Sequence, residues 1–478
     1  MCEYLLILGL HLNSNCTNIL IIYPQTTCIN VKSLLNTSLK ERDGGGFQII
    51  YSKLISLIVF VAVYILIILG LKELAVASLM GVVTLLLLGM IFPGEELLTW
   101  NEAWHYIDFD VIALLIGVIM AAKMLRHVGF FRWLGIYIAN FVRCDPFKLM
   151  IFFTIASALL NSLVGATVVI SLVMSIVALE IMSFLELDPR PVILAIIFTV
   201  NITGMSTSIS SLPTILIASA LGLSFWDFAS AMWLPSVVCV FILIILIALK
   251  YRETFLAEKP RLEVIPISPS QVIPNKKLFA FFFAMFVLMI LGFVFGPEFN
   301  LKPSEVAIIV ASIMLIVGEK YMRLVIREVD WETILSIICL SVLVGSLEKS
   351  GLISDLSTLI AKGVLSGRAI GLTLILWLSA LISAFIDNVP YTMTMIPALK
   401  NIGKMGFDIS YLWWALAAGT SLGGNGTIIA SYANIVVINE VSKRGCEIDA
   451  STFTKLGLPL VLISTVVVNI LLLLMYSF

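Results

Sequence analysis

Apolar segments long enough to cross a lipid bilayer recur along most of the chain, separated by short polar connectors. A spanning helix needs about 20 apolar residues. The candidate spans lie at 54–71, 74–92, 109–125, 191–222 and 229–249, and again at 278–297, 303–318, 332–347, 410–439 and 456–476. This pattern predicts an all-α polytopic membrane protein.

The composition agrees with that class, since 60% of the 478 residues are hydrophobic and only 12% are charged. Soluble domains carry about a quarter charged residues. The net charge of −1 gives no reason to expect a nucleic-acid partner. The chain has no GxxxxGK[ST] motif and no protease or zinc motif, so we expect neither an ATP-driven pump nor an enzyme, and no cofactor.

The segments of the first half return in the same order in the second. Three pairs of stretches match: DFDVI (108–112) with DWETI (330–334), SALLNS (157–162) with SAFIDN (383–388), and NITGMSTSISSLPTI (201–215) with SLGGNGTIIASYANI (421–435). Polar residues also interrupt an apolar stretch in each half. If each interrupted stretch is a re-entrant hairpin, every half has five transmembrane helices, and the odd number inverts the second repeat relative to the first.

The loop charges predict the orientation. When the loops are assigned to alternate sides, one side holds 19 of the 29 Lys and Arg residues, and this side should be cytoplasmic. Both termini are then extracytoplasmic. We expect the protein to lie in the cell membrane. The predicted parts are an N-terminal tail at 1–50, repeats at 51–250 and 278–478, and a cytoplasmic connector at 251–277.

The stretch SAFIDNVPYTMTMIPA (383–398) carries a carboxylate, Asp387, inside an apolar region. An ionisable residue at membrane depth costs about 2.5–3.5 kcal/mol on insertion scales and usually serves an ion or proton pathway. Pro390 removes an amide donor and disfavours helix at Val389. We therefore expect two half-helices that meet at a non-helical tip, with Asp387 as the leading site candidate.

The stretch 421–435 places three glycines close together in an apolar span. Such glycines expose backbone groups that can bind ions, although they also permit close helix packing. The polar residues Asn425, Thr427, Ser431 and Asn434 favour a binding site. The polar cluster of the first half has no carboxylate, and we expect Lys123 and Arg126 to extend to the cytoplasmic surface.

The motifs FIDNVP, TMIPA and SLGGNGTIIASYANIVV resemble those of the ion transporter superfamily that includes citrate-transporter-like proteins, arsenite permeases and the P protein group. The resemblance covers about 54–478. The first half departs from the family pattern NIGGTATLIGDPPNILI at Thr203, Ser211, Leu212 and Thr214, and Asn161 stands where the family often has Asp.

The resemblance implies an elevator-type secondary transporter, usually a homodimer, with one substrate site between two hairpin tips and two broken helices. It assigns a coupling ion or proton to Asp387, Asn388, Thr392, Asn161 and Ser162. It assigns substrate binding to Gly424, Asn425, Gly426, Thr427, Asn434, Gly204, Thr207 and Pro213.

The sequence therefore predicts transport of a small inorganic or carboxylate anion, citrate-like or arsenite-like, coupled to Na⁺ or H⁺. No metal is expected beyond a possible Na⁺ at Asp387. Two alternatives stay open, a Na⁺/H⁺ antiporter and an uncoupled anion channel on the same fold.

Overall fold

The computed structural model describes residues 45–68, 71–91, 97–257, 260 and 262–476, together with three two-residue strands near the N-terminus. The strands β1 (Leu10–His11), β2 (Leu20–Ile21) and β3 (Ile29–Asn30) pair antiparallel in that order. Most of the predicted N-terminal tail lies outside the described residues. From residue 45 onward the described chain is helical, as the apolar pattern predicts.

The first half contains long apolar helices and shorter segments between them. Its helices are α3 (Gly45–Ile68), α4 (Leu74–Ile91), α5 (Trp100–Ala103), η1 (Trp104–Tyr106), α6 (Phe109–His127), α7 (Phe130–Phe141), α8 (Pro146–Val164), α9 (Thr167–Phe184), α10 (Arg190–Thr203), α11 (Leu212–Leu221) and α12 (Phe225–Lys250). The connector carries α13 (Arg252–Ala257) and η2 (Pro269–Val272).

The second half repeats this order. Its helices are α14 (Lys276–Phe295), η3 (Gly296–Phe299), α15 (Pro303–Val317), α16 (Glu319–Glu328), α17 (Trp331–Lys349), α18 (Leu352–Leu365), α19 (Arg368–Ser383), α20 (Asn388–Lys404), α21 (Ser410–Gly423), η4 (Ile428–Ala430), α22 (Tyr432–Lys443) and α23 (Ala450–Tyr476). Each half thus has a helix pair, α8–α9 or α19–α20, followed by a broken helix, α10–α11 or α21–α22.

Among the described residues, seven helices are long and apolar enough to cross a membrane, or up to eight if α6 and α7, bent by 60°, form one span. The count differs from the predicted five per half because it includes α8 and α9 and leaves out shorter apolar helices such as α10 and α15. The inverted orientation of the repeats and the division into domains stay predictions.

The α8–α9 turn lies against the break between α10 and α11. Gly165 at this turn has a φ of 69°, and a Cβ added to it would collide with the carbonyl oxygen of Ile209 in the break. The 14 residues of α10 extend about 21 Å at 1.5 Å per residue. The turn therefore reaches only the depth of the break, which supports a re-entrant hairpin.

The α19–α20 turn lies against the second break in the same way. A Cβ added to Gly426 would lie 2.5 Å from the Cβ of Ala384, and the Thr427 hydroxyl donates to the Ala384 carbonyl at 2.7 Å. Each hairpin also packs on the helix that precedes its break, α8 on α10 and α19 on α21.

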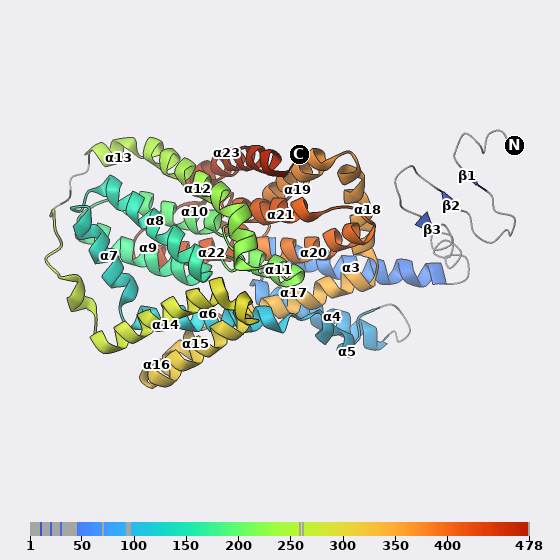
Figure 1. The fold of residues 1–478 in the computed structure, drawn as a ribbon, viewed down its shortest axis with the longest axis horizontal. Coiled ribbons are helices and arrows are strands. Elements are labelled where there is room, and N and C mark those ends of the chain that lie inside the picture. The colour runs from blue at the N-terminus through green and yellow to red at the C-terminus, as the bar shows by residue number, and fades with distance from the viewer. Residues whose placement is uncertain are drawn as a thin grey trace.

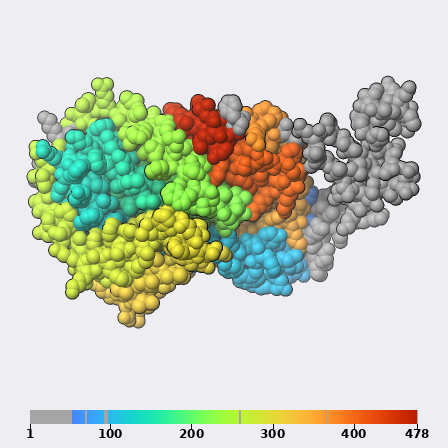
Figure 2. All heavy atoms as spheres, in the orientation of Figure 1, coloured from blue at the N-terminus to red at the C-terminus, as the bar shows by residue number. Residues whose placement is uncertain are grey.

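The two halves interlock. Helix α6 packs against α15, and α17 packs against α4, so each half supplies one partner of both pairs. In Figure 1 the connector helix α13 lies at the left, whereas α18 and the start of α3 lie toward the right. The space-filling view shows the green surface of the first half directly adjoining the orange surface of the second (Figure 2).

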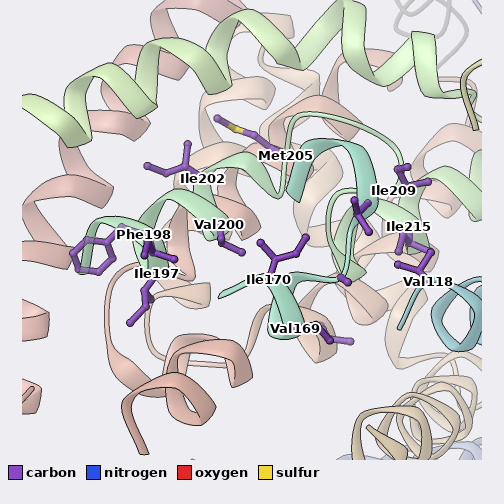
Figure 3. Packing of buried hydrophobic residues seen from close by; sticks show 14 of the residues in the cluster. Val118, Val169, Ile170, Ile197, Phe198, Val200, Ile202, Met205, Ile209 and Ile215 are labelled. Carbon is purple, nitrogen blue, oxygen red and sulfur yellow. The ribbon is translucent and has the colours of Figure 1, made fainter. Parts of the chain in front are cut away.

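Buried aliphatic side chains surround the first break. Figure 3 shows Ile209 and Ile215, on either side of the start of α11, beside Val118 of α6. Phe198 of α10 packs edge-on against Phe453 of α23, with ring centroids 4.8 Å apart. The break is therefore held in a tightly packed apolar setting, in which its polar groups need internal partners.

Candidate functional site

One side chain joins the two breaks. The Nδ2 of Asn201, in the last turn of α10, lies 3.1 Å from the Gly424 carbonyl, 3.0 Å from Asn425 Oδ1 and 2.9 Å from Asn434 Oδ1. In return, Asn425 Nδ2 donates to the Phe198 carbonyl at 3.3 Å. Asn201, Asn425 and Asn434 are all buried, so the two broken helices share one hydrogen-bond network.

In the first break, hydroxyl groups satisfy the carbonyl at the end of α10. The Gly204 carbonyl accepts from Ser210 at 2.7 Å, Ser211 at 2.9 Å and Thr214 at 3.2 Å. Ser211 also caps α11 by accepting from the Thr214 amide. Pro213 fits the first turn of α11 because the amide it lacks would have no helical partner there.

The first hairpin is tied to this break through its own polar side chains. Asn161 Nδ2 donates to the carbonyls of Val200 at 2.9 Å and Ser210 at 3.0 Å. The Ser162 carbonyl accepts from the Thr207 hydroxyl at 2.7 Å. Asn161 Oδ1 is buried and has no hydrogen-bond partner among the described residues.

In the second break, an amide side chain takes the corresponding role. Asn434 Nδ2 donates to the carbonyls of Gly424 at 2.8 Å and Thr427 at 3.2 Å. Asn434 therefore links the end of α21 to the start of α22 across the glycine-rich loop.

Asp387 holds the N-termini of two half-helices. Its Oδ1 accepts from the Val389 amide of α20 at 3.0 Å, and its Oδ2 accepts from the Tyr432 amide of α22 at 3.2 Å. Helix N-termini carry a partial positive charge that favours a carboxylate. The carboxylate is thus positioned by backbone groups on both of its oxygens.

A central cavity lies where four half-helices begin. Its wall includes Thr167–Val168 of α9, Ser211–Pro213 before and in α11, Asp387–Val389 before and in α20, and Ser431–Ala433 before and in α22. Its volume is about 60 Å³, counted as the space open to the centre of a water molecule. Four N-termini that point into one cavity suit a negatively charged ligand.

A second cavity of about 250 Å³ by the same measure adjoins the central one. The two share Thr167, Val168, Leu212, Thr333 and Tyr432. We call it the connector-side cavity, because its wall includes Lys123 near the end of α6, and the α6–α7 turn lies against Val272 of the connector.

The structure brings the predicted site residues into one region, with differing access to the cavity. Asp387, Asn388 and Pro213 line the central cavity. The remaining predicted residues form the hydrogen-bonded layer behind it or pack within it: Asn161, Ser162, Gly204, Thr207, Gly424, Asn425, Gly426, Thr427 and Asn434. Thr392 is turned into its own helix, where its hydroxyl donates to the Asn388 carbonyl at 2.7 Å.

Several lining residues were missed by the sequence interpretation. They are Thr167, Tyr432, Thr333 and Ser336, which face the cavity from three helices, whereas Ser431, already indicated by the glycine-rich stretch, lines it as well. Nothing in the local pattern marks Thr333 or Ser336 of α17. No group of three His, Cys, Asp or Glu side chains suited to a metal ion occurs among the described residues.

The model of the citrate transporter family matches residues 64–419 of the chain. The chain belongs to the citrate transporter family. The resemblance drawn from the hairpin-tip and glycine-rich motifs is thereby confirmed. The family model is described as a citrate transporter and several similar proteins are named transporters, so the site belongs to a transport protein.

An uncharacterised transporter of Mycobacterium tuberculosis is 31% identical to this family member over 411 residues, which cover 84% of this chain and 94% of the relative. The human P protein is 26% identical over 490 residues, covering 86% of this chain but only 58% of the P protein. The crystal structure of the YdaH transporter of Alcanivorax borkumensis matches with a TM-score of 0.53 at 14% identity, over 85% of this chain and 99% of that one. At that identity the last likeness supports the fold alone, a polytopic helical transporter fold.

Proposed function

We propose that this protein is a secondary active transporter of a small anion, a citrate-like carboxylate or an oxyanion, coupled to H⁺ or Na⁺ at Asp387. The observation that carries the proposal is the convergence of four half-helix N-termini and one carboxylate on the central cavity. The family membership supports transport of a carboxylate in particular, since the family model is described as a citrate transporter.

The capping pattern supports separate places for the anion and the cation. Asp387 occupies the N-termini of α20 and α22. The N-terminus of α9 has no side-chain cap, and the Asn388 side chain makes no hydrogen bond to the described residues. An anion would therefore bind to the free amides of α9 and to the amide group of Asn388.

Charge repulsion supplies the coupling. An anion about 5 Å from an ionised Asp387 is opposed by about 3 kcal/mol at an effective dielectric constant of about 20. A proton or Na⁺ on Asp387 removes this repulsion, which corresponds to roughly a hundredfold gain in anion affinity. By linkage, the anion raises the affinity for the cation by the same factor, so the two ligands bind together.

The packing supports an elevator-type movement. Helices α8–α12 and α19–α23 pack with one another around the breaks, whereas α6 packs mainly against α15 and α4 mainly against α17. We propose that the first group moves as a unit against the second and carries the cavity across the bilayer. We also propose a homodimer in the cell membrane with both termini outside.

One observation favours a second function, Na⁺/H⁺ exchange without an anion. Asp387 already serves as the negative ligand of two helix N-termini, and an exchanger needs no other anion. An uncoupled anion channel on the same fold is distinguished from both by current that reverses with the anion gradient and produces no accumulation.

The test is uptake into proteoliposomes of citrate, arsenite and chloride under imposed pH and Na⁺ gradients, for the wild type and Asp387→Asn. Because the neutral amide mimics the cation-loaded carboxylate, we expect the variant to retain anion exchange at equal concentrations and to lose gradient-driven accumulation. Asp408→Asn is the matched control, since Asp408 is an exposed loop carboxylate paired with Arg368 at 2.6 Å.

Unchanged dependence on pH and Na⁺ in Asp387→Asn would refute the role of this residue. Cation flux that needs no anion in the wild type would replace the proposal with exchange.

A further inference from the structure

Lys123 is buried in the transmembrane region although it lies only one turn from the end of α6. The expectation that its long side chain reaches the surface is wrong, because only 8% of the residue is exposed. The expectation holds better for Arg126, whose side chain is 36% exposed. Lys123 lies in the wall of the connector-side cavity.

The Lys123 ammonium group has no hydrogen bond and no carboxylate within ion-pair distance among the described residues. Two carboxylates, Glu328 and Asp330, line the same cavity wall and attract the ammonium group from beyond ion-pair distance, but each has nearer partners. Glu328 lies 3.5 Å from Arg126 and 3.3 Å from His127, and Asp330 accepts from the amide of Thr333 at 3.1 Å and from its hydroxyl at 2.7 Å. A buried unpaired charge is costly, and in transmembrane segments it marks an ion or substrate pathway.

The N-terminus of α9 lines the same cavity. Residues Gly165 to Val169 contribute to its wall, and α9 has 18 residues, so its N-terminus carries the partial positive charge of a full-length helix. Ala166, the residue before the helix, supplies no side-chain cap. Lys123 and the uncapped amides of α9 therefore border one cavity of about 250 Å³, which shares five lining residues with the central cavity.

We infer that the connector-side cavity is an anion subsite in which Lys123 and the N-terminus of α9 bind a carboxylate or oxyanion group of the transported anion. The inference rests on the proposed function and extends it. A substrate with two charged groups can place one in each cavity, because Thr167 and Val168 line both. Lys123 is then the residue that favours multiply charged anions over chloride.

The test is the concentration dependence of initial citrate uptake in proteoliposomes by the wild type, Lys123→Gln and Lys123→Arg. We expect KM to rise at least tenfold in Lys123→Gln with little change in kcat, and less than threefold in Lys123→Arg, which retains the charge. Lys148→Gln is the matched control, because Lys148 is an exposed lysine of α8 outside both cavity walls, and its KM should stay within twofold of the wild type.

Thermal unfolding in detergent separates this role from a structural one. Without citrate, Lys123→Gln should be at least as stable as the wild type, because an unpaired buried charge is removed. With citrate, the stabilisation seen for the wild type should be smaller in Lys123→Gln and preserved in Lys123→Arg.

Wild-type citrate uptake with an unchanged KM in Lys123→Gln would overturn the subsite and leave the proposed function standing. An equal KM change in Lys148→Gln would also overturn it, since a general surface-charge effect would then be sufficient. Absence of uptake of any tested anion by the wild type would overturn the proposed function, and the subsite with it.

Discussion

Replacement of Asn201 should weaken the contact between the two halves more than replacement of any single surface charge. Its Nδ2 faces three acceptors in the second break, Gly424 O, Asn425 Oδ1 and Asn434 Oδ1. Gly424 O also accepts from Asn434, so it keeps a partner when Asn201 is removed. Asn425 Oδ1 and Asn434 Oδ1 would keep no partner, because no other donor to them occurs among the described residues.

The expected cost follows from these two oxygens. A buried polar atom left without a partner costs about 1–3 kcal/mol. Since one amide group carries two hydrogens, two acceptors at most are bonded at full strength together, and we expect Asn201→Ala to destabilise the fold by about 2–4 kcal/mol. Asn201→Asp has nearly the same shape but cannot donate when ionised, so it should cost at least as much.

The assay is thermal unfolding of the purified protein in detergent, followed by tryptophan fluorescence. For a chain of this size about 1 kcal/mol corresponds to roughly 1 °C, so the midpoint should fall by about 2–4 °C or more. Asn469→Ala is the matched control, because Asn469 accepts one hydrogen bond, from Thr373 at 3.1 Å. It should lower the midpoint by about 1 °C.

Equal midpoints for the wild type, Asn201→Ala and Asn201→Asp would refute this reasoning. A loss in Asn201→Ala that Asn201→Asp does not share would assign the effect to the volume of the side chain and not to its donors.

Two further predictions concern Gly165 at the α8–α9 turn and the ion pair between Glu102 and Lys349. Gly165→Ala should impair uptake and stability together, because a φ of 69° disfavours residues other than glycine and the added Cβ would collide with the Ile209 carbonyl oxygen. Normal uptake and an unchanged unfolding midpoint would contradict the contact. The pKa of Glu102 is lowered from 4.5 to about 2, chiefly by its hydrogen bonds with Lys349. A carboxylate whose pKa is lowered in the folded state stabilises the fold above pH 4.5, and this stabilisation is lost as the pH falls toward 2. Glu102→Gln should therefore be less stable than the wild type at pH 7, by about 0.5 kcal/mol for this partly exposed pair. The difference in stability between the two proteins should disappear between pH 4.5 and 2. A gap that does not depend on pH in unfolding measurements would exclude the ion pair as its cause.

The positions of the hairpin tip and the second break could be predicted from the sequence. Pro390 and the glycines at 423–426 both indicate that an apolar helix is interrupted nearby. Both features are local, and the structure has non-helical residues at both places. The expectation that Val389 is not helical is wrong, because Asp387 caps α20 and places Val389 and Pro390 in its first turn, where a missing amide donor costs little; the non-helical residues are 384–387.

The composition of the cavity wall could not be predicted in the same way. Thr333 faces the cavity because α17 packs beside the hairpins, and Asn201 joins the breaks because residues more than 200 positions apart in sequence come together. Lys123 was misplaced because its distance from the helix end suggests access to the surface. Its burial depends on the helices that pack against α6, among them α15, α16 and α9, which no local pattern reveals.

The central claim is that cation binding at Asp387 drives an anion through the central cavity. The most direct measurement is the steady-state ratio of internal to external citrate in proteoliposomes under an imposed pH or Na⁺ gradient, with the membrane potential clamped. A ratio well above one that falls to one when the gradient is dissipated is the predicted result. A ratio that stays at one while citrate crosses the membrane would contradict coupling and leave an uncoupled pathway.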